Sequence, residues 1–297
     1  MTRRALLLFL VLSLAGAMLL AGCAGSASAP VVEDLAQVAD ASRDAETASF
    51  SLRVEQELGD RSLSIAADGA FDTPEKRARL SVDLSSLATI FAQFDKAFGV
   101  PAGGLEGLDD PAKWKVEAIQ DGTKVYLSSP LLEGALPKGK TWVSGDLEKL
   151  GKGQGIDLGQ VGAFGESDPR EALDILRGFS GDLEQVGRES VRGVDTTHYR
   201  ATLDPEKIAA EVGKSKGGGD LVGGLVDQVK QAGLREIPVD VWVDDDMLLR
   251  RLELKVSSTQ SGDATFTMEL YDYGEPVDVT PPPADQVADA SQLRTTK

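Results

Sequence analysis

The chain has 297 residues, a formal net charge of −17 and a single cysteine. The acidic charge argues against nucleic acid as a partner, because phosphates require a basic surface. One cysteine excludes a disulfide within one chain and a metal site built from several thiolates. We interpret the acidic excess as a contribution to solubility.

The start of the chain has the layout of a secretory signal. Two arginines precede an apolar run over residues 5–20, which is shorter than the roughly 20 residues that span a bilayer comfortably. The run ends in "LAGC", which resembles the lipobox of bacterial lipoproteins, where the cysteine is acylated and becomes the new N-terminus. We therefore expect residues 1–22 to be a signal peptide and residues 23–30 to be a lipidated, flexible tether. Acylated Cys23 would hold the protein on the extracytoplasmic face of the cell membrane.

Residues 31–283 are expected to form one α+β domain. Helical spacing of apolar residues over positions 31–46 predicts a first helix. Alternation of apolar and polar residues then predicts strands of an antiparallel sheet with one buried face. These strands are "SFSLRVEQEL", "LSIAADGAF", "ARLSVDL", the hairpin of "KWKVEAI" and "KVYL" about the turn "QDGT", and "TWV".

The second half of the chain repeats this scheme. Apolar stripes predict helices at residues 87–98, 168–179 and 221–229. Strands are expected around residues 183–191 and 194–203, followed by "IPVDVWV", "LRRLELKV" and "TFTMELYDY". About ten or eleven strands would thus form a sheet whose apolar face the amphipathic helices cover. Residues 284–297 are expected to be a disordered tail.

The stretch "GALPKGKT", residues 134–141, matches the P-loop pattern G-x-x-x-x-G-K-[ST]. Phosphate binding by that loop requires a buried strand before it and a helix N-terminus directly after it. Pro137 removes one N–H donor from the loop, and Thr141 leads into a β-like segment. We therefore expect a surface loop and no bound nucleotide.

The remaining candidates for chemistry are weak. His198 is the only histidine, and strand parity places it on the outer face, opposite Tyr199 and Ala201. No G-x-S-x-G nucleophile motif is present. The acidic run at residues 244–246 lacks the spacing of a calcium loop and is expected to be a charged turn. We expect no enzymatic activity, no catalytic residue, no metal site and no cofactor.

The order of the elements and several phrases resemble the LppX/LprG-type (LppX_LprAFG) lipoproteins of actinobacteria, which share a LolA/LolB-like fold. The phrases are "KVYLSSP", "LPKGKTWVSGDLEKL", "VRGVDTTHYRATLD", "VDVWVDDDMLLRRLEL" and "YDYGEPVDVTPPP". The resemblance implies a curved antiparallel half-barrel sheet that wraps amphipathic helices around an apolar cavity. It also implies binding of the acyl chains of a lipid or glycolipid, which members of the family carry or present in the cell envelope.

The family offers no catalytic signature, so only cavity positions can be inferred, by strand and helix parity. The helix at residues 87–98 would cover the cavity mouth as a lid. The expected cavity residues are Phe50, Leu52, Val54, Ile65, Phe71, Leu80, Val82, Leu87, Ile90, Phe91, Phe94, Phe98, Trp114, Val116, Leu173, Leu176, Val239, Val241, Leu252, Leu254, Phe266 and Met268.

A second interpretation stays open at this point. The periodicity of a filled core and of a lined cavity is the same, because both need one apolar face. The alternative is therefore a structural or sensory envelope lipoprotein that recognises a protein partner through the same fold.

Overall fold

The computed structural model describes residues 35–58, 61–87, 114–129, 132, 135–146, 176, 183–204, 237–258 and 262–293. The chain divides into a unit of residues 1–31 and a unit of residues 32–297, and all described residues belong to the second. The expected signal peptide and tether lie outside the described residues. So do almost all residues of the helices expected at 87–98, 168–179 and 221–229.

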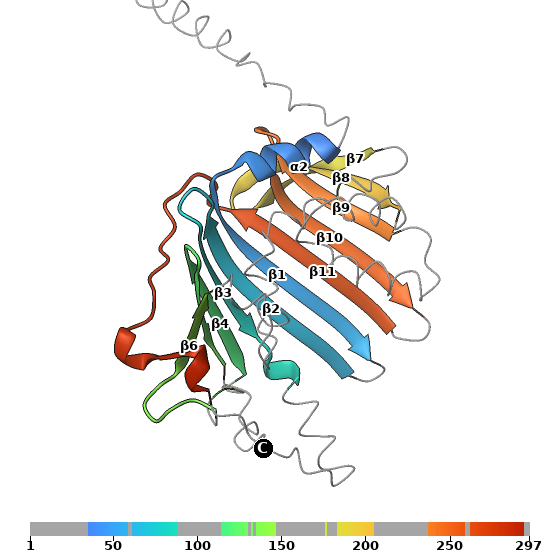
Figure 1. The fold of residues 1–297 in the computed structure, drawn as a ribbon. Coiled ribbons are helices and arrows are strands. Elements are labelled where there is room, and N and C mark those ends of the chain that lie inside the picture. Colours follow the sequence, from blue (N-terminus) through green and yellow to red (C-terminus); the bar gives the residue numbers. More distant parts are fainter. Residues whose placement is uncertain are drawn as a thin grey trace, which may run out of the picture. The chain divides into compact units, whose positions relative to one another are not determined.

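Twelve strands form one curved sheet in the order β12-β6-β5-β4-β3-β2-β1-β11-β10-β9-β8-β7 (Figure 1). The predicted antiparallel pairing is confirmed for every described pair except β12 and β6, which run parallel. The strands are β1 (Thr47–Leu58), β2 (Arg61–Asp72), β3 (Arg77–Asp83), β4 (Lys115–Asp121), β5 (Lys124–Ser128), β6 (Trp142–Asp146), β7 (Glu184–Val191), β8 (Val194–Leu203), β9 (Ile237–Asp244), β10 (Leu249–Ser258), β11 (Gly262–Tyr271) and β12 (Val287–Asp289).

Apolar side chains align in rows across the sheet, because paired residues of neighbouring strands face the same side. In one row Phe50 lies between Leu270 on β11 and Gly69 on β2. The next row runs through Leu252, Met268 and Leu52. The residues that strand parity predicts to face inward therefore lie on the same side of the sheet in both halves of the chain.

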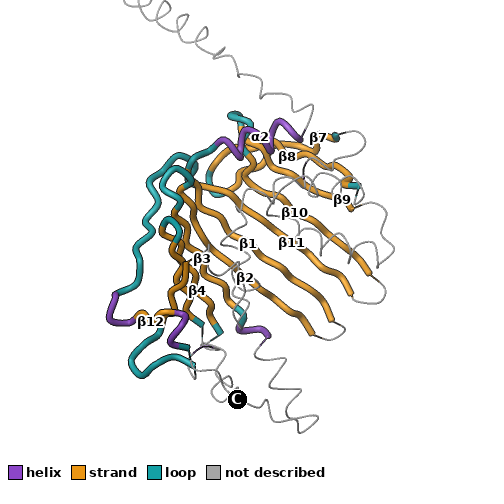
Figure 2. The backbone as a smooth tube through the Cα atoms, viewed as in Figure 1, coloured by secondary structure: helices purple, strands orange, loops and turns teal. Residues whose placement is uncertain are grey.

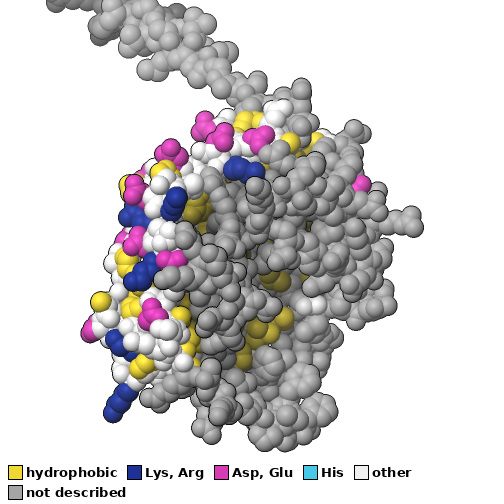
Figure 3. Space-filling view, in the orientation of Figure 1, with side chains coloured by type: hydrophobic (Ala, Val, Ile, Leu, Met, Phe, Trp, Pro, Cys, Tyr) yellow, Lys and Arg dark blue, Asp and Glu magenta, His cyan; other side chains and the backbone are white. Residues whose placement is uncertain are grey.

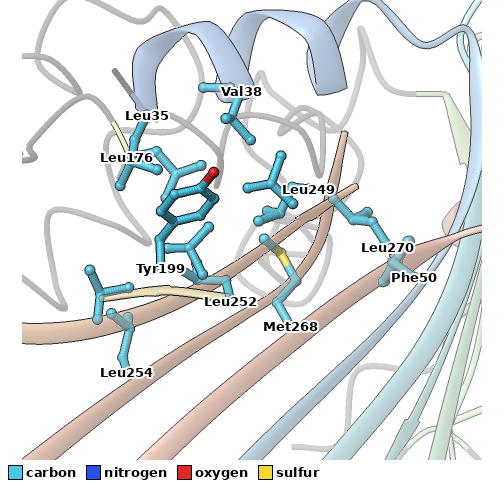
Figure 4. Packing of buried hydrophobic residues seen from close by; sticks show 14 of the residues in the cluster. Leu35, Val38, Phe50, Leu176, Tyr199, Leu249, Leu252, Leu254, Met268 and Leu270 are labelled. Atoms are coloured by element: carbon cyan, nitrogen blue, oxygen red, sulfur yellow. The ribbon is translucent and has the colours of Figure 1, made fainter. Parts of the chain in front are cut away.

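The helix α2 (Leu35–Asp44) covers one end of this apolar face. Leu35 and Val38 point from the helix toward the strands (Figure 4) and are fully buried. The hydroxyl of Ser42 accepts a hydrogen bond of 2.8 Å from the Leu249 N–H, and the Tyr273 hydroxyl donates one of 2.7 Å to the Leu249 carbonyl. Burial raises the pKa of Tyr273 far above its ordinary value, so this phenol stays a neutral donor.

The C-terminal segment has defined secondary structure over residues 284–292, although its sequence predicts a disordered tail. It consists of the short 3-10 helix η4 (Ala284–Gln286), strand β12 and a second 3-10 helix, η5 (Ala290–Gln292). The segment reaches the β6 edge of the sheet after an extended connection (Figure 2). Ala288 is fully buried there, in a second hydrophobic cluster with Leu127, Leu132, Leu136 and Val143.

The residues that complete the P-loop pattern hold this segment in place. Lys140 Nζ donates a hydrogen bond of 2.9 Å to the Asp285 carbonyl, and the Thr141 N–H donates one of 3.0 Å to the Gln286 carbonyl. The next residues form strand β6. The loop is thus followed by a strand and not by the helix N-terminus that phosphate cradling requires.

Close contact across the sheet yields a stability prediction at Gly69. A Cβ atom there would lie 2.3 Å from Phe50 Cζ and 2.6 Å from the Arg79 carbonyl oxygen. We predict that Gly69→Ala lowers the free energy of unfolding by about 1–3 kcal/mol, because the Phe50 ring must move from its packed position. Gly187→Ala is the matched control, since a Cβ at this strand position meets nothing within 4 Å. Urea denaturation of both variants checks the prediction, and equal midpoints would contradict it.

Candidate ligand-binding face

The candidate site is the apolar face of the curved sheet, whose one end α2 covers. We call the strand ends next to α2 the helix end; they include Thr47 and Leu249. We call the opposite strand ends, which include Leu58 and Gly262, the loop end. Hydrophobic side chains of this face are visible in Figure 3, inward of the mixed charged side chains on the left of the view.

Burial is uneven along this face. At the helix end Phe50 and Met268 are each 3% exposed and Leu270 is 5% exposed. Further toward the loop end on the same strands, Val54 and Phe266 are only half-buried, although they pair directly with each other. The apolar face therefore extends beyond the part that is fully packed.

Burial also falls across the sheet within one row. Leu252 and Met268 on β10 and β11 are buried, whereas Leu52 in the same row on β1 is half-buried. The row continues through Ala67 to half-buried side chains on β3 and β4. We call the partly accessible apolar residues the half-buried patch: Leu52, Val54, Ile65, Val82, Val116 and Phe266.

The patch is a subset of the cavity residues expected from sequence. Nine further members are buried and pack in the main hydrophobic cluster: Phe50, Phe71, Leu80, Leu176, Val239, Val241, Leu252, Leu254 and Met268. Trp114 is also buried, and Leu87 is half-buried. Cys23, Ile90, Phe91, Phe94, Phe98 and Leu173 lie outside the described residues.

Two core residues at the helix end are not among the cavity residues expected from the sequence. Leu249 is fully buried, but a register shift between Leu249 and Arg251 breaks the alternation on β10. Such an irregularity leaves no clear periodic signal. Leu270 continues the parity of Met268 on β11 and is buried beside Phe50, but it is not among the expected cavity residues.

The outer face carries the only histidine in a packed polar cluster. His198 stacks on Trp242 with ring centroids 4.2 Å apart, and its Nε2 lies 2.7 Å from Asp240 Oδ1. Its Nδ1 lies 3.3 Å from Glu189 Oε1 and makes no hydrogen bond to a described residue. Parity placed this side chain on the outer face correctly, but neighbouring side chains bury it. These contacts join β7, β8 and β9, so the described geometry gives the histidine a packing role.

A second group on the outer face is ionic. Arg251 and Arg192 donate hydrogen bonds of 2.8 Å and 2.7 Å to the two carboxylate oxygens of Glu269. Burial opposes ionisation of Glu269, but the two guanidinium groups outweigh it and hold the pKa of this carboxyl below its ordinary value. The Arg192 guanidinium also lies over the Tyr271 ring, 3.9 Å from its centroid. These contacts link the β7–β8 turn to β11.

A cavity of about 280 Å³ lies at the helix end of the sheet, lined by Val191, Arg192, Val194, Arg250, Leu270, Tyr271 and Asp272. Both arginines are engaged by carboxylates, Arg192 with Glu269 at 2.7 Å and Arg250 with Asp244 at 2.6 Å. None of the expected cavity residues lines it. Within the described ranges, no three His, Cys, Asp or Glu side chains gather as a metal site would need. In the same residues no helix has the length and apolar character to cross a membrane.

Comparison with known proteins relates part of the chain to one family. The fold and the apolar face define a protein built on one large curved antiparallel sheet. Residues 168–279 match the model of the LppX_LprAFG lipoprotein family, which confirms the resemblance predicted from the sequence.

Relatives extend over only part of the chain. An uncharacterized 31.2 kDa protein of Streptomyces griseus is 31% identical over 159 residues, which cover 52% of this chain and 50% of that protein. The chain thus spans about half the length, or somewhat less, of the curated relatives that it matches. The crystal structure of lipoprotein LppX from Mycobacterium tuberculosis aligns with a TM-score of 0.43 at 14% identity, covering 83% of this chain and 96% of that one. LprF from Mycobacterium bovis aligns with the same TM-score and identity, covering 84% and 94%.

Two leucines in one row of the sheet test the uneven packing. Leu252 is 1% exposed, whereas Leu52 is half-buried. We predict that Leu252→Ala lowers the free energy of unfolding by about 2–5 kcal/mol, and that Leu52→Ala costs less than half as much, because less packing is lost. Denaturant titration of the two variants measures both values. Equal losses would mean that the face is packed uniformly and has no accessible patch.

Proposed function

We propose that this protein is an envelope lipoprotein that binds the acyl chains of a lipid or glycolipid against the half-buried patch and carries or presents the lipid. The single observation that carries the proposal is the patch itself, an apolar continuation of the core whose side chains are only half-buried. Apolar surface left in water costs about 25 cal/mol per Å². A bound acyl chain would remove that cost.

The chemistry of the patch favours an apolar ligand. Val54 lies between Phe266 and Ile65 in one row, and Leu52 continues the patch toward the core. These side chains offer no charged group or hydrogen-bond donor. The patch can therefore recognise methylene groups by contact, and a polar headgroup would have to lie elsewhere.

Membrane attachment is proposed through acylated Cys23 on the extracytoplasmic face. Two acyl chains suffice for stable anchoring, at about 0.8 kcal/mol per buried CH₂. The net charge of −17 gives the protein no general attraction to anionic headgroups. The anchor would therefore supply the attachment, and the family match to lipoproteins supports this assignment.

Cys23→Ala is expected to move the protein from the membrane fraction to the soluble exported fraction, because the acylation site is lost. Ser26→Ala, in the same tether, is the control and is expected to leave the protein in the membrane fraction. Fractionation followed by immunoblotting measures the distribution. Retention of the Cys23→Ala protein in membranes would contradict the proposed anchor.

The acyl-binding proposal predicts a specific loss of affinity for Val54→Asp. A carboxylate in the patch must lose its hydration when an acyl chain binds, so we expect affinity for a pyrene-labelled 16-carbon fatty acid to fall by at least about tenfold, or 1.4 kcal/mol. Thr267→Asp is the control, since it adds the same charge on the neighbouring strand but on the opposite face of the sheet.

Fluorescence titration of the Cys23→Ala protein and of both aspartate variants in that background measures the dissociation constants. Circular dichroism and thermal unfolding verify that each variant is folded. No saturable binding by the parent protein, or equal affinity in the two aspartate variants, would overturn the proposal.

A further inference from the structure

The β6 edge of the sheet is closed by the chain's own C-terminal segment in an unusual way. β12 is three residues long and runs parallel to β6, with Ala288 opposite Val143. Parallel pairing is slightly less stable per residue than antiparallel pairing. The last strand is thus the shortest in the sheet and uses the weaker type of ladder.

Two hydrogen bonds that hold this segment are made to its main chain. Lys140 Nζ and the Thr141 N–H donate to the carbonyls of Asp285 and Gln286. Among the side chains of the segment, Ala288 is fully buried in the hydrophobic cluster behind β6, and the partly buried Ala290 and Leu293 pack against that cluster. A copy of the segment from another molecule, in the same conformation, would satisfy the same contacts.

The connection to β12 has no regular secondary structure, and Val279 within it is buried. Residues 276–283 form no helix or strand (Figure 2), and no backbone hydrogen bond joins residues 276–282 to another described residue. Pro276 and the run Pro281–Pro283 favour an extended backbone with little freedom to fold back. Eight such residues span about 25 Å, which is enough to reach a neighbouring molecule.

Charge complementarity favours this segment over other occupants of the edge. Residues 284–293 contain two acidic residues, Asp285 and Asp289, and no basic residue. The facing loop, residues 135–141, contains Lys138 and Lys140 and no acidic residue. The chain as a whole has a net charge of −17. The two lysines make this loop a local positive region that attracts the acidic C-terminal segment.

We propose that the β6 edge is a strand-addition site and that two copies of this chain exchange their C-terminal segments, each β12 pairing with β6 of the other copy. Exchange recreates every β12–β6 contact of the single molecule, so it needs no new complementary surface. Release of β12 exposes an unpaired strand edge, which is a template for pairing with another chain. A second copy is the occupant because it carries the matching segment. The proposal is independent of the lipid-binding function.

Engineered thiols test the exchange directly. The Cys23→Ala background contains no cysteine, so one population receives Val143→Cys and the other Ala288→Cys. After the two are mixed and oxidised, exchange predicts a disulfide-linked dimer on a non-reducing gel, in a fraction that rises with protein concentration. The double variant Val143→Cys/Ala288→Cys verifies the pairing, because its unexchanged form closes the disulfide within one chain.

A control for disulfides that form by random collision places the cysteine at the opposite edge of the sheet. Val186→Cys on β7 replaces Val143→Cys in a parallel mixture, since Val186 is 44% exposed. Equal cross-linking in the two mixtures would overturn the proposal. So would the absence of inter-chain links while the double variant closes within one chain. Light scattering on the Cys23→Ala protein without added thiols gives an independent result: exchange predicts a dimer that grows with concentration, and a monomer at every concentration refutes it.

Discussion

The pairing of β1 with β11 determines how the apolar face of the sheet is built. It joins residues 47–58 to residues 262–271 and so places the two halves of the chain in one sheet. Because the register aligns Phe50 with Leu270 and Leu52 with Met268, apolar rows continue from one half into the other. α2 then has a single apolar surface to cover, and Ser42 fixes it to the start of β10 through the Leu249 N–H.

This continuous face is larger than the part that is tightly packed. Near α2 the side chains of Leu35, Val38 and Leu249 are fully buried, as expected of a hydrophobic core. Around Val54 and Phe266 the same face is only half-buried. A stable core at one end and an accessible apolar surface at the other are the two requirements of a protein that stays folded while it binds and releases an apolar ligand. The uneven packing therefore links the fold to the proposed function.

Strand parity predicted most of the described sheet, because strands such as β1, β10 and β11 place alternate apolar residues on one face. The strands expected at residues 183–191 and 194–203 occur as β7 and β8 almost without change. Parity failed at Leu249, where a register shift interrupts alternation. It had no information on β12, since three residues are too short for a periodic signal. It also placed His198 on the outer face without predicting its burial, which depends on Trp242 and Asp240 from the adjacent strand. The half-buried patch could not be predicted from the sequence, since a filled core and an open apolar face have the same periodicity.

Native mass spectrometry of the Cys23→Ala protein, purified without detergent from its own host, tests whether the half-buried patch holds a lipid. Acyl-chain binding predicts a second mass above that of the polypeptide, which disappears after extraction with organic solvent and is recovered in the organic phase as a lipid. It also predicts that the extracted protein regains this mass when the recovered lipid is returned. A protein that carries no extractable mass and takes up none of the host's lipids would contradict the assignment of the half-buried patch as an acyl-chain site.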